Sequence, residues 1–174
     1  MSRGLGDVYK RQEIYFLVSA DKIADTIRDF GMERTPNEKI IIFGGNLIAG
    51  YLASKLEQDD NIQSVKIIDE DEESARFLAD TLKDAVVIHG EMMSDVILTE
   101  AGIQSADAAI AVTSHDKDNL LASLLAKKSG VSSAISLVNS RAYDNLIDNV
   151  ADNILIDRSS VTISSILQEL RKAN

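Results

Sequence analysis

Apolar runs alternate with segments of helical periodicity over most of this 174-residue chain. The run from Ile40 to Phe43 contains no polar residue, which is typical of a strand buried on both faces of a sheet. Two glycines, Gly44 and Gly45, follow directly, and apolar residues then recur at helical spacing from Leu47. This order of strand, glycine turn and helix predicts the start of a βαβ unit. The helix would direct its N-terminal amides and the positive end of its dipole towards an anion above the turn.

The same alternation continues along the chain and predicts the fold class. Strands are expected at 40–43, 64–68, 85–88, 108–112, 134–138 and 154–156, and helices at 47–56, 74–82, 96–100, 119–128, 141–149 and 161–171. This order predicts an α/β fold with a Rossmann-like, doubly wound, mainly parallel six-stranded sheet and helices on both faces. Right-handed crossovers would bring the C-terminal ends of the strands to one edge, where a ligand crevice is expected at the point of reversed strand order.

The residues before this alternation have a different character. Residues 1–12 are polar and lack any period, resemble translated sequencing-adapter sequence, and are expected to be non-native and disordered. A strand at 13–18 and a helix at 22–30 cannot bury much surface by themselves, so 13–38 is interpreted as the end of a preceding domain with a linker that contains Pro36. The main domain is then 39–174.

Composition excludes several classes of function. The formal net charge is −10, which argues against nucleic-acid binding because phosphate contacts need clustered Lys and Arg. The chain has no cysteine, so disulfides, thiolate chemistry and cysteine-based metal sites are excluded. No stretch of the sequence is long and apolar enough to span a bilayer.

The glycine turn approximates the dinucleotide-binding pattern G-x-G-x-x-G/A over residues 44–49. Gly44 fits the first position and Ala49 is an accepted third, but Asn46 replaces the second glycine. We expect the Asn46 side chain to crowd the space that a glycine leaves for a pyrophosphate. The pattern therefore predicts the fold more firmly than it predicts the ligand.

Asp69 is the strongest single candidate for contact with a nucleotide. It ends the second apolar run, where an acidic residue can accept hydrogen bonds from ribose hydroxyls, and its charge disfavours the 2′-phosphate of NADP. The alternative is that Asp69 only favours the positive end of the next helix, the role expected of Asp71, Glu72 and Glu73.

Further polar residues follow the other strands at the same predicted edge. They are Glu70 after the second strand, His89, Gly90 and Glu91 after the third, and Thr113, Ser114, His115 and Asp116 after the fourth. The two histidines are weak candidates for acid–base catalysis or metal binding, because no nucleophile motif or ligand spacing accompanies them. Lys127 and Lys128 are interpreted as charges at a helix C-terminus ahead of Gly130.

Several of these motifs together resemble one family. They are Ile-Ile-Ile-Phe-Gly-Gly-Asn at 40–46, Val-Lys-Ile-Ile-Asp at 65–69, Ile-His-Gly-Glu at 88–91, Ala-Ile-Ala-Val-Thr-Ser at 109–114 with Asp116 and Asn119, and Arg-Ala-Tyr at 141–143. They are similar to the KTN domain, or RCK N-lobe, of the TrkA-N family found in regulatory subunits of bacterial Trk potassium uptake. The similarity covers about 13–174 and resembles the end of a first C-lobe followed by a second N-lobe.

The resemblance implies a binding site and partners. It implies that Gly44, Gly45, Asn46, Leu47, Ala49, Asp69 and Glu70 hold NAD(H) or ATP/ADP, with Gly90, Glu91, Thr113 and Ser114 on the adenosine side. The family pattern has glycines at 46 and 49 and an aspartate at 91, so this chain departs from it at three positions. The implied partners are further copies of the chain, as a dimer or higher homo-oligomer, and a TrkH/TrkG-like membrane potassium-transporter subunit. The implied location is the cytoplasmic face of the cell membrane.

Three functions compete at this point. A regulatory domain would sense a nucleotide and shift the conformation of an assembly that gates ion transport. An oligomerisation module would keep a degenerate pocket, and apolar stripes at 141–149 and 161–170 predict self-association. An NAD-dependent oxidoreductase is least favoured, because neither histidine lies in a recognisable catalytic pattern.

Overall fold

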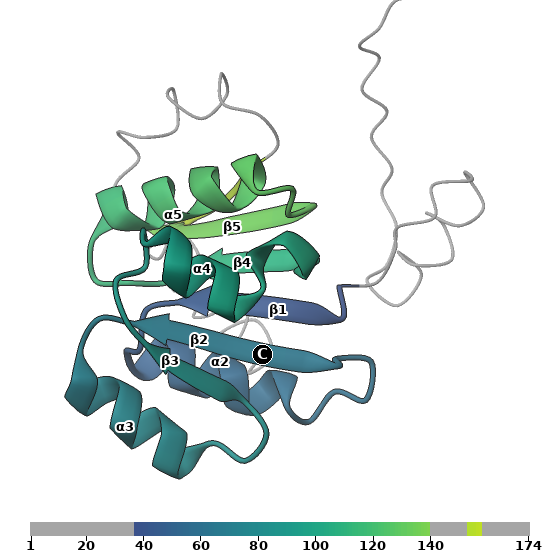
Figure 1. Cartoon of the computed structure of the whole chain (residues 1–174), viewed down its shortest axis with the longest axis vertical. Coiled ribbons are helices and arrows are strands. Elements are labelled where there is room, and N and C mark those ends of the chain that lie inside the picture. Colours follow the sequence, from purple (N-terminus) through teal and green to yellow (C-terminus); the bar gives the residue numbers. More distant parts are fainter. Residues whose placement is uncertain (1–36, 140–152, 158–174) are drawn as a thin grey trace, which may run out of the picture. The chain divides into compact units, whose positions relative to one another are not determined.

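The fold is a six-stranded parallel sheet with helices on both faces, seen in a computed structural model that describes residues 37–139 and 153–157 (Figure 1). The strands are β1 (Lys39–Phe43), β2 (Ser64–Asp69), β3 (Val86–His89), β4 (Ala108–Ala111), β5 (Ser133–Val138) and β6 (Asn153–Asp157). All neighbouring pairs are parallel, and their order is β3-β2-β1-β4-β5-β6. The strand order reverses between β1 and β4, which makes the C-terminal ends of these two strands the expected place for a ligand.

The helices cover the two faces in pairs. They are α2 (Leu47–Leu56), α3 (Glu72–Thr81), α4 (Asp95–Ala101) and α5 (Asp116–Lys128), with a short 3-10 helix, η2 (Ile103–Ser105), between α4 and β4. In Figure 1, α4 and α5 lie on the near side of the sheet and α2 on the far side.

Each face of β1 belongs to a different hydrophobic core. Ile40 and Ile42 pack with α2 and α3, whereas Ile41 and Phe43 pack with α4 and α5. All four side chains are buried, as predicted for a central parallel strand. The chain direction at the C-terminal end of β1 is therefore set by packing on both sides of the sheet, which fixes the position of the glycine turn.

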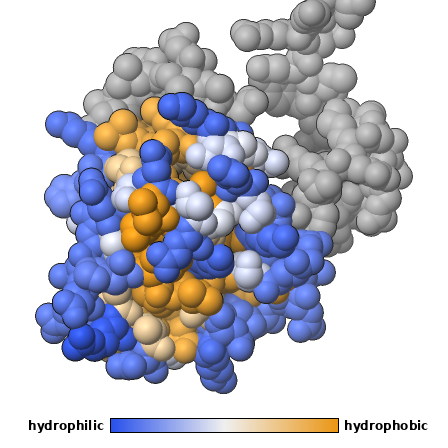
Figure 2. Space-filling model, viewed as in Figure 1, coloured by the Kyte–Doolittle hydropathy of each residue, from blue (hydrophilic) through white to orange (hydrophobic). Residues whose placement is uncertain are grey.

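The near face keeps part of its apolar surface exposed. Val96 of α4 and Leu121 of α5 are more than half exposed, and so is Val86 at the sheet edge. Figure 2 shows the apolar surface of this face bordered by hydrophilic side chains. An exposed apolar patch with a polar border is typical of an interaction surface.

The strands and helices predicted between 40 and 138, and the strand at 154–156, are confirmed as elements of a mainly parallel doubly wound sheet. One boundary differs by three residues: α5 begins at Asp116 rather than 119, because Asp116 and Asp118 favour its first turn although that turn has no apolar residue. The short helix η2 was not predicted. The predicted elements at 13–18, 22–30, 141–149 and 161–171 lie outside the described residues. Within the described ranges, no helix is long and apolar enough to cross a membrane.

Candidate functional site

A cleft of about 350 Å³ lies at the C-terminal ends of β1, β2 and β4, where the strand order reverses. Of the residues predicted to bind a nucleotide, it is lined by Gly44, Gly45, Asn46, Asp69, Glu70, Thr113 and Ser114. Its other lining residues are Asp71, Ser74, Met92, His115 and Asp118. The predicted crevice and this cleft therefore coincide.

Gly44 makes the turn between β1 and α2. Its φ of 101° lies in the left-handed region, and a Cβ there would come within 3.0 Å of the backbone of Thr113. Its amide donates to the Ile68 carbonyl at 2.8 Å, which joins the turn to the end of β2. The absence of a side chain thus lets three strand ends meet around the floor of the cleft.

Gly45 is needed for a different reason, the position of Asp69. A Cβ on Gly45 would lie 1.9 Å from Oδ2 of Asp69, so the carboxylate rests directly against the glycine turn. Burial is the main cause that raises the pKa of Asp69, and hydrogen bonds from the Asp71 and Glu70 amides partly oppose it. The Asp69 carboxylate therefore lies at the end of β2 beside the turn that leads into α2.

Asn46 caps the N-terminus of α2. Its Oδ1 accepts from the amides of Ile48 at 2.9 Å and Ala49 at 3.1 Å, and its Nδ2 donates to the Val112 carbonyl at the end of β4. Its backbone is extended, with φ −74° and ψ 177°, so this position does not need a glycine for backbone reasons. The side chain thus occupies two amides of the helix N-terminus, which are groups of the kind that bind anions.

The loop after β4 is held by a buried asparagine. Asn119 is 1% exposed; its Oδ1 accepts from the Thr113 amide at 2.7 Å, and its Nδ2 donates to the Leu137 carbonyl at 2.7 Å. The hydroxyl of Ser136 in turn donates to the Asn119 carbonyl at 3.1 Å. Thr113 and Ser114 are therefore presented to the cleft from a loop tied to both α5 and β5.

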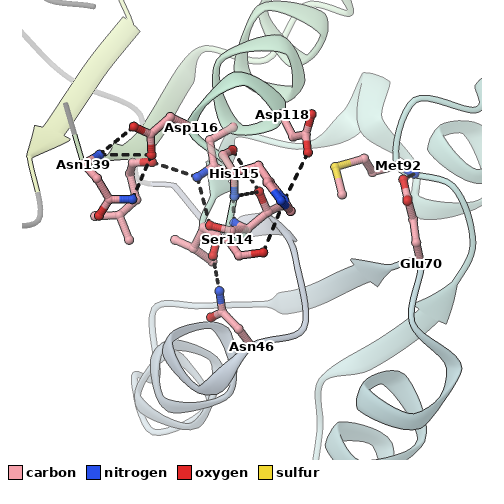
Figure 3. Close-up of polar contacts among 12 residues, drawn as sticks. Asn46, Glu70, Met92, Ser114, His115, Asp116, Asp118 and Asn139 are labelled. Carbon is pink, nitrogen blue, oxygen red and sulfur yellow. Dashed lines mark hydrogen bonds and ion pairs between the residues drawn. The ribbon is translucent and has the colours of Figure 1, made fainter. Parts of the chain in front are cut away.

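The start of α5 carries further polar contacts towards the end of β5. Both oxygens of Asp116 accept from the Asn139 amide at 3.0 Å, and Oδ1 also accepts from its side chain (Figure 3). His115 lies beside Ser114 and Asp118, with its Nδ1 at 3.3 Å and 3.6 Å from their side-chain oxygens. Ser114 and Asp118 meet the same ring nitrogen, so these three residues do not form a nucleophile–base–acid relay, in which the outer groups need opposite nitrogens.

The opposite side of the cleft is formed by the segment after β2. Oε1 of Glu70 accepts from the Met92 amide at 3.2 Å, and the Glu70 carbonyl lies 3.1 Å from Nε2 of His89. Asp71 caps α3 by accepting from the Ser74 amide at 2.8 Å, a hydrogen bond that lowers the pKa of Asp71. The prediction that Asp71, Glu72 and Glu73 lie at the N-terminus of this helix is confirmed.

Four predicted residues lie near the cleft without lining it. Leu47 is 85% exposed and lines a second hollow of about 540 Å³ between α2 and α3, while Ala49 is fully buried against the sheet. Gly90 packs on Ile97, and Glu91 is exposed beyond β3. Conversely, Ser74, Met92 and Asp118 line the cleft although none was a predicted binding residue. Asp118 could have been found from the polar first turn of α5, whereas no sequence signal pointed to Met92.

The charge of the cleft is negative. The carboxylates of Asp69, Glu70, Asp71 and Asp118 line it, and no Lys or Arg does so among the described residues. Within the same part of the chain, no group of three His, Cys, Asp or Glu residues is arranged to hold a metal ion.

The sequence from 40 to 157 matches the TrkA-N domain. The chain belongs to the TrkA-N domain family. Over 158 residues it is 34% identical to the Trk system potassium uptake protein TrkA of Azorhizobium caulinodans, an alignment that covers 91% of the chain and 34% of that protein. The chain thus spans about a third of the length of the curated relatives it matches.

Solved structures of low identity share the fold of this TrkA-N domain. The NAD(P)-binding domain of an exopolyphosphatase-related protein from Archaeoglobus fulgidus aligns with a TM-score of 0.67 at 16% identity, covering 78% of this chain and 98% of that one. The GsuK channel bound to NAD aligns with a TM-score of 0.56 at 21% identity, covering 78% of this chain and 28% of that one.

Proposed function

We propose that this chain is a regulatory nucleotide-binding domain of a Trk-type potassium-uptake system and that it binds NAD(H) in the cleft between the ends of β1, β2 and β4. The observation that carries the proposal is the contact between the Asp69 carboxylate and the Gly44–Gly45 turn. This contact joins a ribose acceptor to a helix N-terminus at the topological switch point, in a member of the TrkA-N family.

The charge of the cleft favours NAD(H) over ATP or ADP. A dinucleotide carries its negative charge on one pyrophosphate diester, whereas ATP and ADP add an ionised terminal phosphate. Four carboxylates line the cleft, so each extra ligand charge is repelled. The Asp69 carboxylate disfavours NADP in the same way, because its 2′-phosphate would approach the ribose acceptor.

Calorimetric titration of the purified chain with NAD, NADH, ADP and ATP tests this proposal. Saturable binding of NAD or NADH that is tighter than that of ATP is the expected result. Heat changes indistinguishable from dilution for all four ligands would contradict nucleotide sensing. Tighter binding of ATP would contradict the choice of ligand.

A second candidate is an assembly module with an empty pocket. The Asn46 side chain favours it, since it already caps the two α2 amides nearest a phosphate. The two candidates differ in the same titration, because only the sensor binds a nucleotide. We expect no substrate-dependent hydride transfer in either case, as no acid–base group of the described residues lines the cleft together with a second group in a catalytic relay.

The remaining assignments follow from the Trk system of the relatives. We propose that 39–174 is the N-lobe, that 13–38 is the end of a preceding C-lobe, and that residues 1–12 are foreign to both. The apolar surface of Val96 and Leu121 is a candidate for contact with a second copy in a homo-oligomer. A TrkH/TrkG-like membrane subunit would hold the assembly at the cytoplasmic face of the membrane. Sedimentation of the chain alone and co-purification with such a subunit test these two contacts.

A further inference from the structure

Among the described residues, the cleft is lined by a single imidazole. His115 lies at its rim, 76% exposed, with Nδ1 at 3.6 Å from Oδ2 of Asp118 (Figure 3). Histidine is the side chain whose ordinary titration changes its charge between about pH 5 and 8. In the described part of the chain, the other ionisable residues that line the cleft are carboxylates.

The groups that face His115 come from two sides. On its own helix, Asp118 is the ion-pair partner, whereas Asp116 is engaged by Asn139. The opposite side of the cleft is lined by three carboxylates from the end of β2 and the residues before α3, namely Asp69, Glu70 and Asp71. The β1–α2 turn contributes Gly44, Gly45 and Asn46, which carry no charge.

These surroundings make the charge of His115 important for an anionic ligand. A pyrophosphate entering the cleft meets four carboxylates and, with His115 neutral, no compensating positive side chain among the described residues. A protonated His115 supplies that charge at the rim. By linkage, a ligand that is attracted to the protonated form must also increase proton binding by the protein.

We propose that nucleotide binding in this cleft is coupled to protonation of His115, so that affinity falls as pH rises and each binding event takes up protons. This inference rests on the proposed nucleotide binding and adds that pH regulates it. The occupancy of the cleft would then depend on both the nucleotide concentration and the pH. His89 is the comparison, because it acts electrostatically on Asp71 and contacts the Glu70 carbonyl but does not itself line the cleft, so it distinguishes a charge in the cleft from a charge behind it.

NAD is the appropriate probe for the test. Its pyrophosphate is a diester and keeps its charge between about pH 6 and 8, whereas the terminal phosphate of ADP or ATP titrates near pH 6 and would hide a change in the protein. Calorimetry at about pH 6 and about pH 8, in two buffers of different ionisation enthalpy, gives both the affinity and the number of protons taken up.

For the parent chain we expect binding about three- to tenfold tighter at the lower pH, the effect of one charge contact across solvent, with net proton uptake. His115→Gln should remove both the pH dependence and the uptake, and His89→Gln should retain them. Equal affinity at the two pH values, or a pH dependence that survives in His115→Gln, would overturn the coupling while leaving the proposed function intact. Failure of both NAD and NADH to bind at either pH would overturn the proposed function and this inference with it.

Discussion

The substitution Asn46→Gly should change stability and ligand affinity in opposite directions. It removes the Oδ1 acceptor of the Ile48 and Ala49 amides and the Nδ2 donor of the Val112 carbonyl. Glycine is itself tolerated at a helix N-cap, so the lost cap costs only a few tenths of a kcal/mol. The Val112 carbonyl belongs to a buried residue, and loss of its side-chain partner costs about 1 to 3 kcal/mol.

The same change leaves the two α2 amides available to a ligand. Hydrogen bonds to a charged acceptor contribute about 1.5 to 3 kcal/mol, which corresponds to roughly 10- to 100-fold in affinity. We therefore expect Asn46→Gly to unfold more readily than the parent and to bind NAD or NADH more tightly. A loss of stability by itself would not produce this combination.

Urea denaturation and calorimetric titration on the same preparations provide both measurements. Asn46→Asp is an informative partner, because a carboxylate can still cap the amides but adds negative charge to the cleft, so its binding should weaken. Asn61→Gly makes the same exchange at an exposed residue away from the cleft and should leave affinity unchanged. Binding that is equal or weaker in Asn46→Gly would refute the competition between the cap and the phosphate.

Further substitutions at three positions test other parts of the site. Asp69→Ala should weaken NAD or NADH binding by about 1 to 3 kcal/mol in calorimetry; unchanged affinity would remove Asp69 from the site. Burial raises the pKa of Asp69 in the folded chain, so ionisation of this carboxyl lowers the free energy of unfolding as pH rises above its pKa in the unfolded chain. Asp69→Asn should therefore be more stable than the parent at neutral pH. Urea denaturation repeated at decreasing pH should show this difference disappearing in acid. Gly45→Ala should lower both the melting temperature and the affinity by displacing Asp69, and adding Asp69→Ala should restore the melting temperature but not binding. Asn119→Ala should destabilise the fold by about 2 to 4 kcal/mol in urea titrations, since it leaves the buried amide and carbonyl of Thr113 and the part-buried Leu137 carbonyl without their side-chain partner. A smaller loss than that of exposed Asn61→Ala would contradict this.

Much of the fold could be predicted because the spacing of hydrophobic residues indicates which segments form strands and which form helices. The wholly apolar run Ile40–Phe43 requires burial on both faces, and the structure divides its side chains between two cores. Regular alternation of such runs with helical segments then leaves few possible topologies. The start of α5 was missed because its first turn is polar, and periodicity detects apolar faces only.

The candidate site was predictable in position but not in detail. Gly44 and Asp69 were found because strand ends converge at a known edge, whereas the contact between Asp69 and Gly45 depends on the pairing of β1 with β2 and leaves no local mark in the sequence. The capping role of Asn46 is visible in the sequence, because an asparagine immediately before an amphipathic segment is typical of an N-cap. The glycine pattern indicates only that Asn46 is larger than the expected glycine and says nothing of its acceptor oxygen.

The cap also bears on how such a domain could act as a sensor. A phosphate that binds at α2 must replace the hydrogen bonds of Asn46, so the net gain in free energy is smaller than at an uncapped helix. The occupancy of a site responds to ligand concentration only when that concentration is close to the dissociation constant. Weaker binding raises the dissociation constant towards the concentrations over which a sensor has to respond. Displacement of Asn46 would also release its hydrogen bond to the Val112 carbonyl, next to the loop that Asn119 ties to β5. On the proposed function, Asn46 would therefore connect the occupancy of the cleft with the β4 end of the sheet, and a contact that differs between the bound and free states is what a ligand needs to shift a conformational equilibrium.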